Sequence, residues 1–130
     1  MKLTPEERNA VVAYRKEKAH TTLAEAKGIA EQGYWTAVAN RLYYSAYYIV
    51  TALLIQNELP AHTHSGVRHL FSLHFVKTQK ISIEMARIFT KLFELRLSGD
   101  YDDLYNLDEE QVKPFVELTE NFIKEVETII

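Results

Sequence analysis

The chain has 130 residues, a length that suits one domain with one hydrophobic core. Hydrophobic residues make up 47% of it and charged residues 25%, the balance of an ordinary globular protein. The formal net charge of -3 excludes a global basic field that recruits nucleic acid, although it leaves room for a local basic patch. The absence of cysteine excludes disulfides, zinc–thiolate sites and thiol nucleophiles.

Two stretches of the sequence bear on the cellular location. The first seven residues are polar and lack the apolar stretch of a signal peptide. The longest apolar run, residues 47–55, is shorter than the roughly 20 helical residues that span a bilayer. We therefore expect a cytoplasmic protein with no membrane association.

The first predicted helix covers residues 5–32. Thr4 is suited to the N-cap, Pro5 to the first helical position and Glu7 to the reciprocal position of a capping box. Gly33 is suited to cap the other end, and Gly28 inside the helix marks a weak point or a close contact. The larger apolar positions recur at roughly helical spacing, at Val11, Tyr14, Leu23, Ala26 and Ala30.

Two further helices are predicted over residues 34–57 and 65–78. The apolar stripe of the first consists of Val38, Leu42, Ala46, Ile49 and Leu53. Pro60 ends that segment, and a polar loop leads into the next helix. The second helix places four residues on one face: Val67, Leu70, Phe71 and His74.

A fourth helix is predicted from about residue 82 to Gly99, which stops it. An acidic loop over residues 100–107 follows, and Asp108 caps a last helix at about 109–129. Its inward positions are Val112, Phe115, Thr119, Phe122 and Val126. No segment alternates with a period of two, so we expect no sheet.

The predicted architecture is an all-α, up-and-down antiparallel bundle of four to five helices, with residues 1–130 forming a single domain. The connections between the helices are short, which favours antiparallel neighbours. Surplus apolar side chains on the second and fourth helices predict a homodimer seam. They are Tyr47, Tyr48, Phe89 and Phe93.

Two segments carry polar groups on helices that should be buried. The second helix contains Arg41 within a run of tyrosines that includes Tyr44, and the fourth ends in Arg96, Asp100 and Tyr101. Buried arginine and tyrosine need partners, so these residues build either a polar network or a binding site. If the two arginines converge, the binding-site interpretation gains, because two unpaired guanidinium groups form an anion receptor.

The structural alternative for each arginine is an ion pair. Arg41 would then pair with Glu94, Asp100 or Asp102, and Arg96 with Asp100 or Asp103. The histidines have no standard spacing of metal ligands, so we predict no metal and no other cofactor. Instead, His64 is expected to cap or pin the loop before the third helix, and His74 to be partly buried.

Three segments, taken together and in register, resemble the HEPN domain family. They are Asn-Arg-Leu-Tyr-Tyr-Ser-Ala-Tyr-Tyr at 40–48, Thr-His-Ser-Gly-Val at 63–67 and Leu-Phe-Glu-Leu-Arg at 92–96 with Asp100 and Tyr101. The resemblance implies a helical bundle, usually dimeric, often encoded beside a nucleotidyltransferase as its toxin or antitoxin partner. It also implies that several branches are metal-independent ribonucleases, in which an arginine is followed by a few polar residues and a histidine.

The chain departs from that ribonuclease motif after Arg96. The position that would hold the histidine holds Tyr101, and no histidine follows residue 74. Tyrosine, with an ordinary pKa of about 10, is a poor general base at neutral pH. The resemblance therefore implies a nucleotide-binding or nucleotidyltransferase-partner module of a toxin–antitoxin-type system, with no predicted catalytic residue. The predicted nucleotide- or phosphate-binding residues are Arg41, Tyr44, Arg96, Asp100 and Tyr101.

Two alternatives stay open beside this prediction. The chain is a metal-independent ribonuclease toxin with a degenerate site, in which Arg96 binds phosphate and another residue moves the proton. Or it is a structural protein-interaction domain that binds no small ligand.

Overall fold

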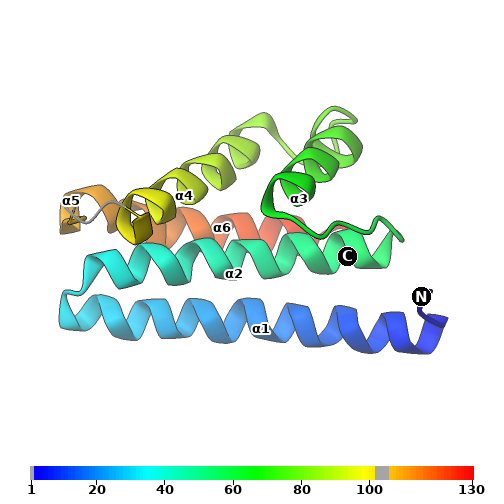
Figure 1. The fold of residues 1–130 in the computed structure, drawn as a ribbon, viewed down its shortest axis with the longest axis horizontal. Helices are drawn as coiled ribbons and strands as arrows, with labels where there is room; N and C mark the ends of the chain where they lie inside the picture. The colour runs from blue at the N-terminus through cyan, green and yellow to red at the C-terminus, as the bar shows by residue number, and fades with distance from the viewer. Residues whose placement is uncertain (1, 102–105) are drawn as a thin grey trace.

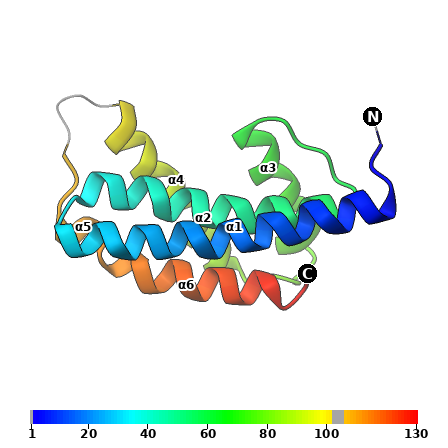
Figure 2. The same cartoon turned by 90° about the horizontal axis from the view of Figure 1, so that it is seen from below.

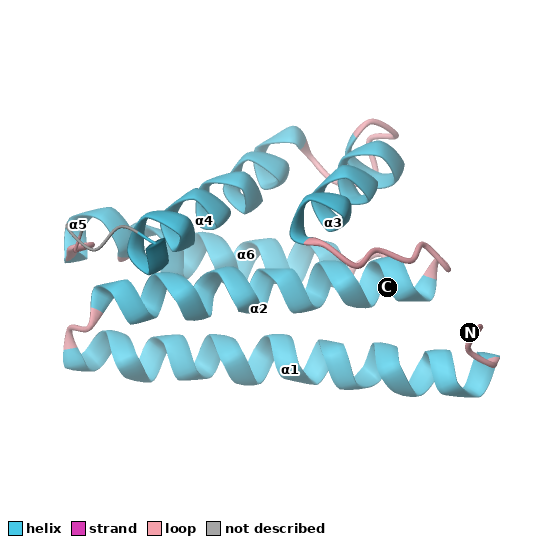
Figure 3. Ribbon diagram, in the orientation of Figure 1, coloured by secondary structure: helices cyan, strands magenta, loops and turns pink. Residues whose placement is uncertain are grey.

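The computed structural model describes the backbone of residues 2–101 and 106–130, and the side chains of the same residues except Tyr101. Its helices are α1 (Pro5–Gln32), α2 (Trp35–Gln56), α3 (His64–Phe71) with the π-helix Ser72–Val76, α4 (Ile83–Tyr101), α5 (Glu109–Val112) and α6 (Pro114–Glu127). No strand occurs in these two ranges (Figure 3), so the all-α prediction is confirmed. None of the helices described is long and apolar enough to cross a membrane.

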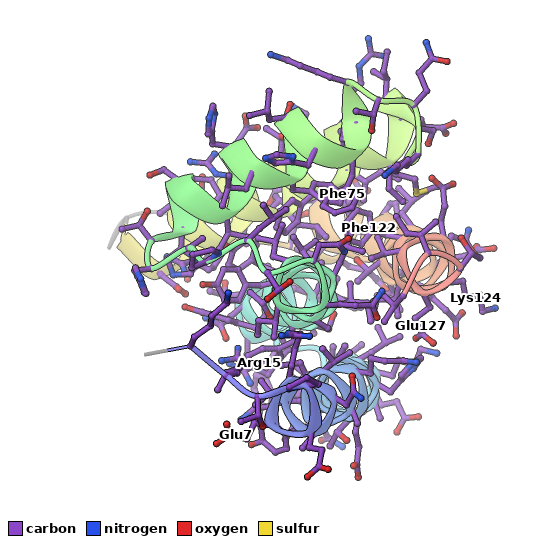
Figure 4. All side chains as sticks on the ribbon, turned by 90° about the vertical axis from the view of Figure 1, so that its right-hand side faces the viewer. Glu7, Arg15, Phe75, Phe122, Lys124 and Glu127 are labelled. Atoms are coloured by element: carbon purple, nitrogen blue, oxygen red, sulfur yellow. The ribbon has the colours of Figure 1, made fainter. Side chains whose placement is uncertain are left out.

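Helix α2 is the centre of the bundle. It packs against α1, α3, α4, α5 and α6. Helix α1 runs antiparallel to it, and α4 also runs opposite to α2 while crossing it at an angle (Figure 1). In the view along the bundle, α1, α6 and α3 lie on three different sides of α2 (Figure 4). Such a helix must be apolar over most of its surface, and its predicted stripe is fully buried: Val38, Leu42, Ala46, Ile49 and Leu53.

Both ends of helix α1 are fixed by interactions between residues close in sequence. The Thr4 hydroxyl accepts a hydrogen bond from the Glu7 backbone N–H at 3.1 Å, and the Glu7 carboxylate accepts one from the Thr4 N–H at 2.8 Å. Gly33 has a φ of 80°, a left-handed conformation that favours glycine at a helix end. The predicted apolar positions are partly wrong, because Tyr14 is 58% exposed. The buried residues of α1 are Val12, Ala19, Thr22, Leu23 and Ala26.

The helix predicted over residues 65–78 consists of two parts. Helix α3 begins after Thr63, whose hydroxyl accepts from the Gly66 N–H at 2.9 Å. It then widens into the π-helix, in which Lys77 N–H donates to the Ser72 carbonyl at 2.9 Å. Phe71 and Phe75, four residues apart, both lie in the core.

Gly99 does not stop α4, which corrects the prediction. The helix continues to Tyr101, because one glycine costs a helix only about 1 kcal/mol relative to alanine. Gly99 instead allows neighbouring side chains to pack closely against α4. A Cβ atom at position 99 would lie 2.9 Å from Cγ2 of Thr36 and 3.2 Å from Cδ1 of Leu107.

The last predicted helix is divided into α5 and α6. Asp108 caps α5 as predicted, with Gln111 completing a capping box. The division falls at Pro114, which lacks the backbone N–H that a continuous helix requires. Helix α6 packs against α2 and α4, and viewed from below it lies along the lower edge of the bundle (Figure 2).

Phe89 is part of the core, which corrects its assignment to a dimer seam. It is 2% exposed, and its ring stacks against Phe122 at a centroid distance of 5.5 Å and against Tyr43 at 6.0 Å. The reason is that α4 turns this residue toward α2 and α6 at once. Tyr47, Tyr48 and Phe93 are half-buried.

Candidate functional site

Arg96 is a buried cation of the bundle, with 5% of its surface exposed. Its Nη1 donates to the Tyr44 hydroxyl at 2.7 Å, and its Nε lies 3.7 Å from Oδ2 of Asp100, one helical turn away on α4. The guanidinium carbon is 5.1 Å from the ring centroid of Tyr43 and 5.3 Å from that of Tyr44. Arg96 therefore ties the end of α4 to the first half of α2 and pairs with one of the predicted carboxylates.

Arg41 is held mainly by its sequence neighbour. The Asn40 side-chain carbonyl accepts from Nε of Arg41 at 3.0 Å and from Nη2 at 2.8 Å. The nearest described carboxylate is Glu25 of α1, 3.8 Å from Nη1. Glu94 and Asp100 are not its partners, which corrects the prediction, because Arg41 lies on the side of α2 that faces α1. Asp102 lies outside the described residues.

Asn40 joins the two arginines into one network. Its Nδ2 donates to Oδ2 of Asp100 at 3.1 Å, and the same oxygen lies near Nε of Arg96. Both guanidinium carbons also lie within cation–π range of the Tyr44 ring, Arg41 at 5.5 Å and Arg96 at 5.3 Å. We call these five residues the arginine–tyrosine network: Asn40, Arg41, Tyr44, Arg96 and Asp100.

The structure thus brings together Arg41, Tyr44, Arg96 and Asp100 from the predicted set. The fifth predicted residue, Tyr101, ends α4, and its side chain lies outside the described part of the structure. A hollow of about 750 Å³ opens beside the network. Its lining includes Trp35, Asn40, Arg41 and Asp100. The hollow is open to solvent, so it is a depression of the surface and not an enclosed cavity.

A second group of polar side chains, which the sequence analysis did not assign to a site, lies on the other side of the same rings. Nδ1 of His64, the first residue of α3, lies 2.6 Å from the hydroxyl of the buried Tyr43. Burial raises the pKa of Tyr43 well above its ordinary value, so the hydroxyl keeps its proton. We assign the Tyr43 hydroxyl as the donor to Nδ1, because no other described group accepts from it, and this assignment places the proton of neutral His64 on Nε2.

Arg68 lies one turn beyond His64 on α3. Its guanidinium carbon sits 3.8 Å from the ring centroid of Phe93, a close cation–π contact. Within the described ranges, no carboxylate lies within 4.0 Å of Arg68, and its buried Nε has no hydrogen-bond partner. We call His64, Arg68, Tyr43 and Phe93 the His64 cluster.

The two groups share their aromatic rings. Arg96 lies 5.9 Å from the Phe93 centroid, and the His64 ring lies 5.7 Å from Tyr43 and 6.0 Å from Tyr44 between centroids. Burial, and then the positive charges of Arg96 and Arg68, lower the pKa of His64 below its ordinary value. The arrangement is therefore a local concentration of cations in a chain whose formal net charge is negative.

The remaining histidines do not form a metal site among the described side chains, where no group of three or more histidine, aspartate or glutamate residues could hold an ion. His74 is half-buried as predicted. His64 does hold the start of α3, although through Tyr43 and not through a cap, which Thr63 supplies.

The comparisons with known proteins agree with the resemblance. The HEPN domain model matches residues 12–129. A UPF0332 protein of Thermotoga maritima is 34% identical over 124 residues, covering 95% of this chain and 94% of the relative. The Methanocaldococcus jannaschii protein named "Putative toxin MJ0605" is 30% identical, covering 85% and 87% of the two chains.

A solved structure resembles the fold. The crystal structure of TT1696 from Thermus thermophilus superposes with a TM-score of 0.77 over 92% of this chain and 98% of that one. The two sequences are 14% identical, so this likeness bears on the fold alone.

Proposed function

The chain belongs to the HEPN domain family, and we propose that it is the nucleotide-binding, toxin-type partner in a two-component toxin–antitoxin system. The observation that supports this most is the convergence of Arg41 and Arg96 on the Tyr44 ring. Two guanidinium groups beside an aromatic face suit a ligand that has both a phosphate and a base. The hollow beside Arg41, with Trp35 in its lining, offers a place for that base.

The proposed partner is a nucleotidyltransferase, and the proposed assembly is a homodimer in the cytoplasm. Relatives named as toxins support the two-component setting. The half-buried Tyr47, Tyr48 and Phe93 are the remaining candidates for an apolar seam, now that Phe89 belongs to the core.

A ribonuclease is the second candidate function, and one observation favours it. His64, separated from Arg96 by thirty-two positions in the chain, shares three aromatic rings with it: Tyr43, Tyr44 and Phe93. An arginine and a histidine near the same rings support this candidate, although the sequence lacks the histidine after Arg96.

The test measures binding of AMP and of a labelled single-stranded RNA to purified protein in EDTA. Arg41→Ala removes a guanidinium group proposed to contact the phosphate, and Tyr44→Phe removes the hydroxyl that holds Arg96. Each variant should therefore weaken AMP binding by about tenfold. Arg87→Ala is the matched control, since Arg87 is an exposed arginine on α4. Equal affinity of wild type and both variants would contradict the proposal. The same RNA, separated on a gel afterwards, reports whether it was cleaved.

A further inference from the structure

The His64 cluster contains an arginine whose charge is not balanced nearby. The structure describes no carboxylate within 4.0 Å of Arg68, while the stacking on Phe93 fixes its guanidinium in place. Its buried Nε makes no hydrogen bond to any described group. A partly desolvated cation without a counter-ion is costly, and an anion beside the guanidinium group would offset that cost through its charge.

His64 presents a second donor at the same place. Tyr43 occupies Nδ1, so the proton of neutral His64 is on Nε2, and none of the described groups accepts a hydrogen bond from Nε2. The ring also lies near Tyr47 and Phe93, at centroid distances of 4.7 Å and 6.4 Å. A donor that is oriented by its own hydrogen-bond partner and by neighbouring rings is pre-organised for a ligand.

Among the described residues, the charges that act on His64 are positive. Arg68 lies on its own helix and Arg96 on α4, and both act on its ionisation, while the groups facing it from α2 are Tyr43, Tyr44 and Tyr47. The carboxylate of Asp100 engages Arg96 and Asn40, and it does not reach Arg68 within 4.0 Å. The described carboxylate that pairs with Arg96 therefore does not balance the charge of Arg68.

We propose that His64 and Arg68 form an oxyanion subsite that binds a phosphate group, distinct from the contacts of Arg41. The guanidinium supplies a fixed positive charge, and Nε2–H of His64 donates to a phosphate oxygen. This inference rests on the proposed function for the identity of the ligand, since the phosphate belongs either to a free nucleotide or to an RNA strand. Both sources present the same oxyanion chemistry.

Bound phosphate also changes the proton balance of the subsite. The anion favours protonated His64, so binding draws a proton onto Nδ1 at pH values where the ring is otherwise neutral, and the Tyr43 hydroxyl turns from donor to acceptor of that hydrogen bond. For the RNA, whose phosphodiester groups keep their charge over this range, binding should therefore strengthen as the pH falls from about 8 toward about 6. A histidine that only holds α3 in place would not give this dependence.

The experiment uses the full chain and calorimetric titration with three ligands: inorganic phosphate, AMP and a short single-stranded RNA. We expect Arg68→Gln to weaken binding by about tenfold or more, and His64→Gln to abolish the uptake of a proton on binding. His69→Gln, an exposed histidine on the same helix, should behave like the wild type. Circular dichroism melting of each variant establishes that it is folded.

The outcomes separate this inference from the proposed function. If Arg68→Gln and His64→Gln bind all three ligands as the wild type does, the subsite does not exist, whatever Arg41→Ala does. If Arg68→Gln and His64→Gln weaken binding while Arg41→Ala and Tyr44→Phe do not, the subsite stands and the proposed role of the arginine–tyrosine network falls. Effects of the subsite variants on RNA alone assign the phosphate to a strand, and effects on AMP assign it to a nucleotide.

Discussion

His64 is the residue whose charge depends most directly on its surroundings. Its imidazole is packed among tyrosine rings, hydrogen-bonded by Tyr43, and close to two guanidinium groups. Burial and the two guanidinium groups disfavour the protonated ring, and the hydrogen bond from Tyr43 stabilises one tautomer of the neutral form. The folded protein therefore binds a proton at His64 less readily than the unfolded chain does.

This difference predicts how stability depends on pH. The folded-state pKa of His64 is lowered below the unfolded value of about 6.5, so the unfolded chain binds more protons between the two values. The contribution of His64 to stability is complete above about pH 6.5 and is lost as the pH falls through the folded-state pKa. Thermal melting across this range should show a smaller acid-induced loss for His64→Gln than for the wild type, with His69→Gln unchanged. Parallel curves for wild type and His64→Gln would rule this out.

At the same scale, the site divides into residues that the sequence could and could not reveal. Arg41, Tyr44, Arg96 and Asp100 were predictable, because charged and phenolic groups on helices expected to be buried must find one another. Arg68 was not, because its proximity to Phe93 depends on the angle at which α3 approaches α4. The only signal was its position directly after the Thr-His-Ser-Gly-Val segment.

At the scale of elements, helix ends were predictable where their chemistry is local. The capping boxes of Thr4 with Glu7 and of Asp108 with Gln111 form between residues three apart, so the sequence contains both partners. Gly99 was misread because glycine serves two purposes, ending helices and allowing close approach. Only the positions of Thr36 and Leu107 show that the second purpose applies.

The packing at Gly99 makes a prediction with a control in the same chain. Gly99→Ala places a methyl group 2.9 Å from Cγ2 of Thr36, so it should destabilise the protein by about 1–3 kcal/mol. Gly28→Ala, in α1, meets nothing within 4 Å and should stabilise it by about 0.5–1 kcal/mol. Urea unfolding of both variants measures these free energies. A Gly99→Ala protein as stable as the wild type would mean that α4 and Thr36 are further apart than described.

At the scale of the molecule, one continuous set of aromatic rings joins the core to the site. Phe71, Phe89 and Phe122 pack together from α3, α4 and α6, and Tyr43 of α2 stacks on Phe89. The hydroxyl of Tyr43 then orients His64. The polar groups of the site therefore rest on the hydrophobic core, which explains how a bundle of simple helices holds them in place.

Phe122 is the ring on which this arrangement can be tested. It is fully buried, and its centroid lies 5.5 Å from that of Phe89 and 6.0 Å from that of Phe71. Phe122→Ala removes these contacts and leaves a cavity, so it should lower the free energy of unfolding by about 3–5 kcal/mol. A domain is stabilised by only about 5–15 kcal/mol, so the alanine variant could lose its fold. In that case Phe122→Leu is the variant to use, because leucine keeps more of the side-chain volume and should destabilise the protein less.

Tyr14→Ala supplies the comparison, since this side chain is 58% exposed on α1 and its loss should change stability by no more than about 0.5 kcal/mol. Urea unfolding measures all three proteins. Equal losses at positions 122 and 14 would mean that α6 does not close the core over α4. A loss of stability at position 122 alone would mean that the packing of α6 supports Phe89, and through Phe89 also Tyr43 and His64.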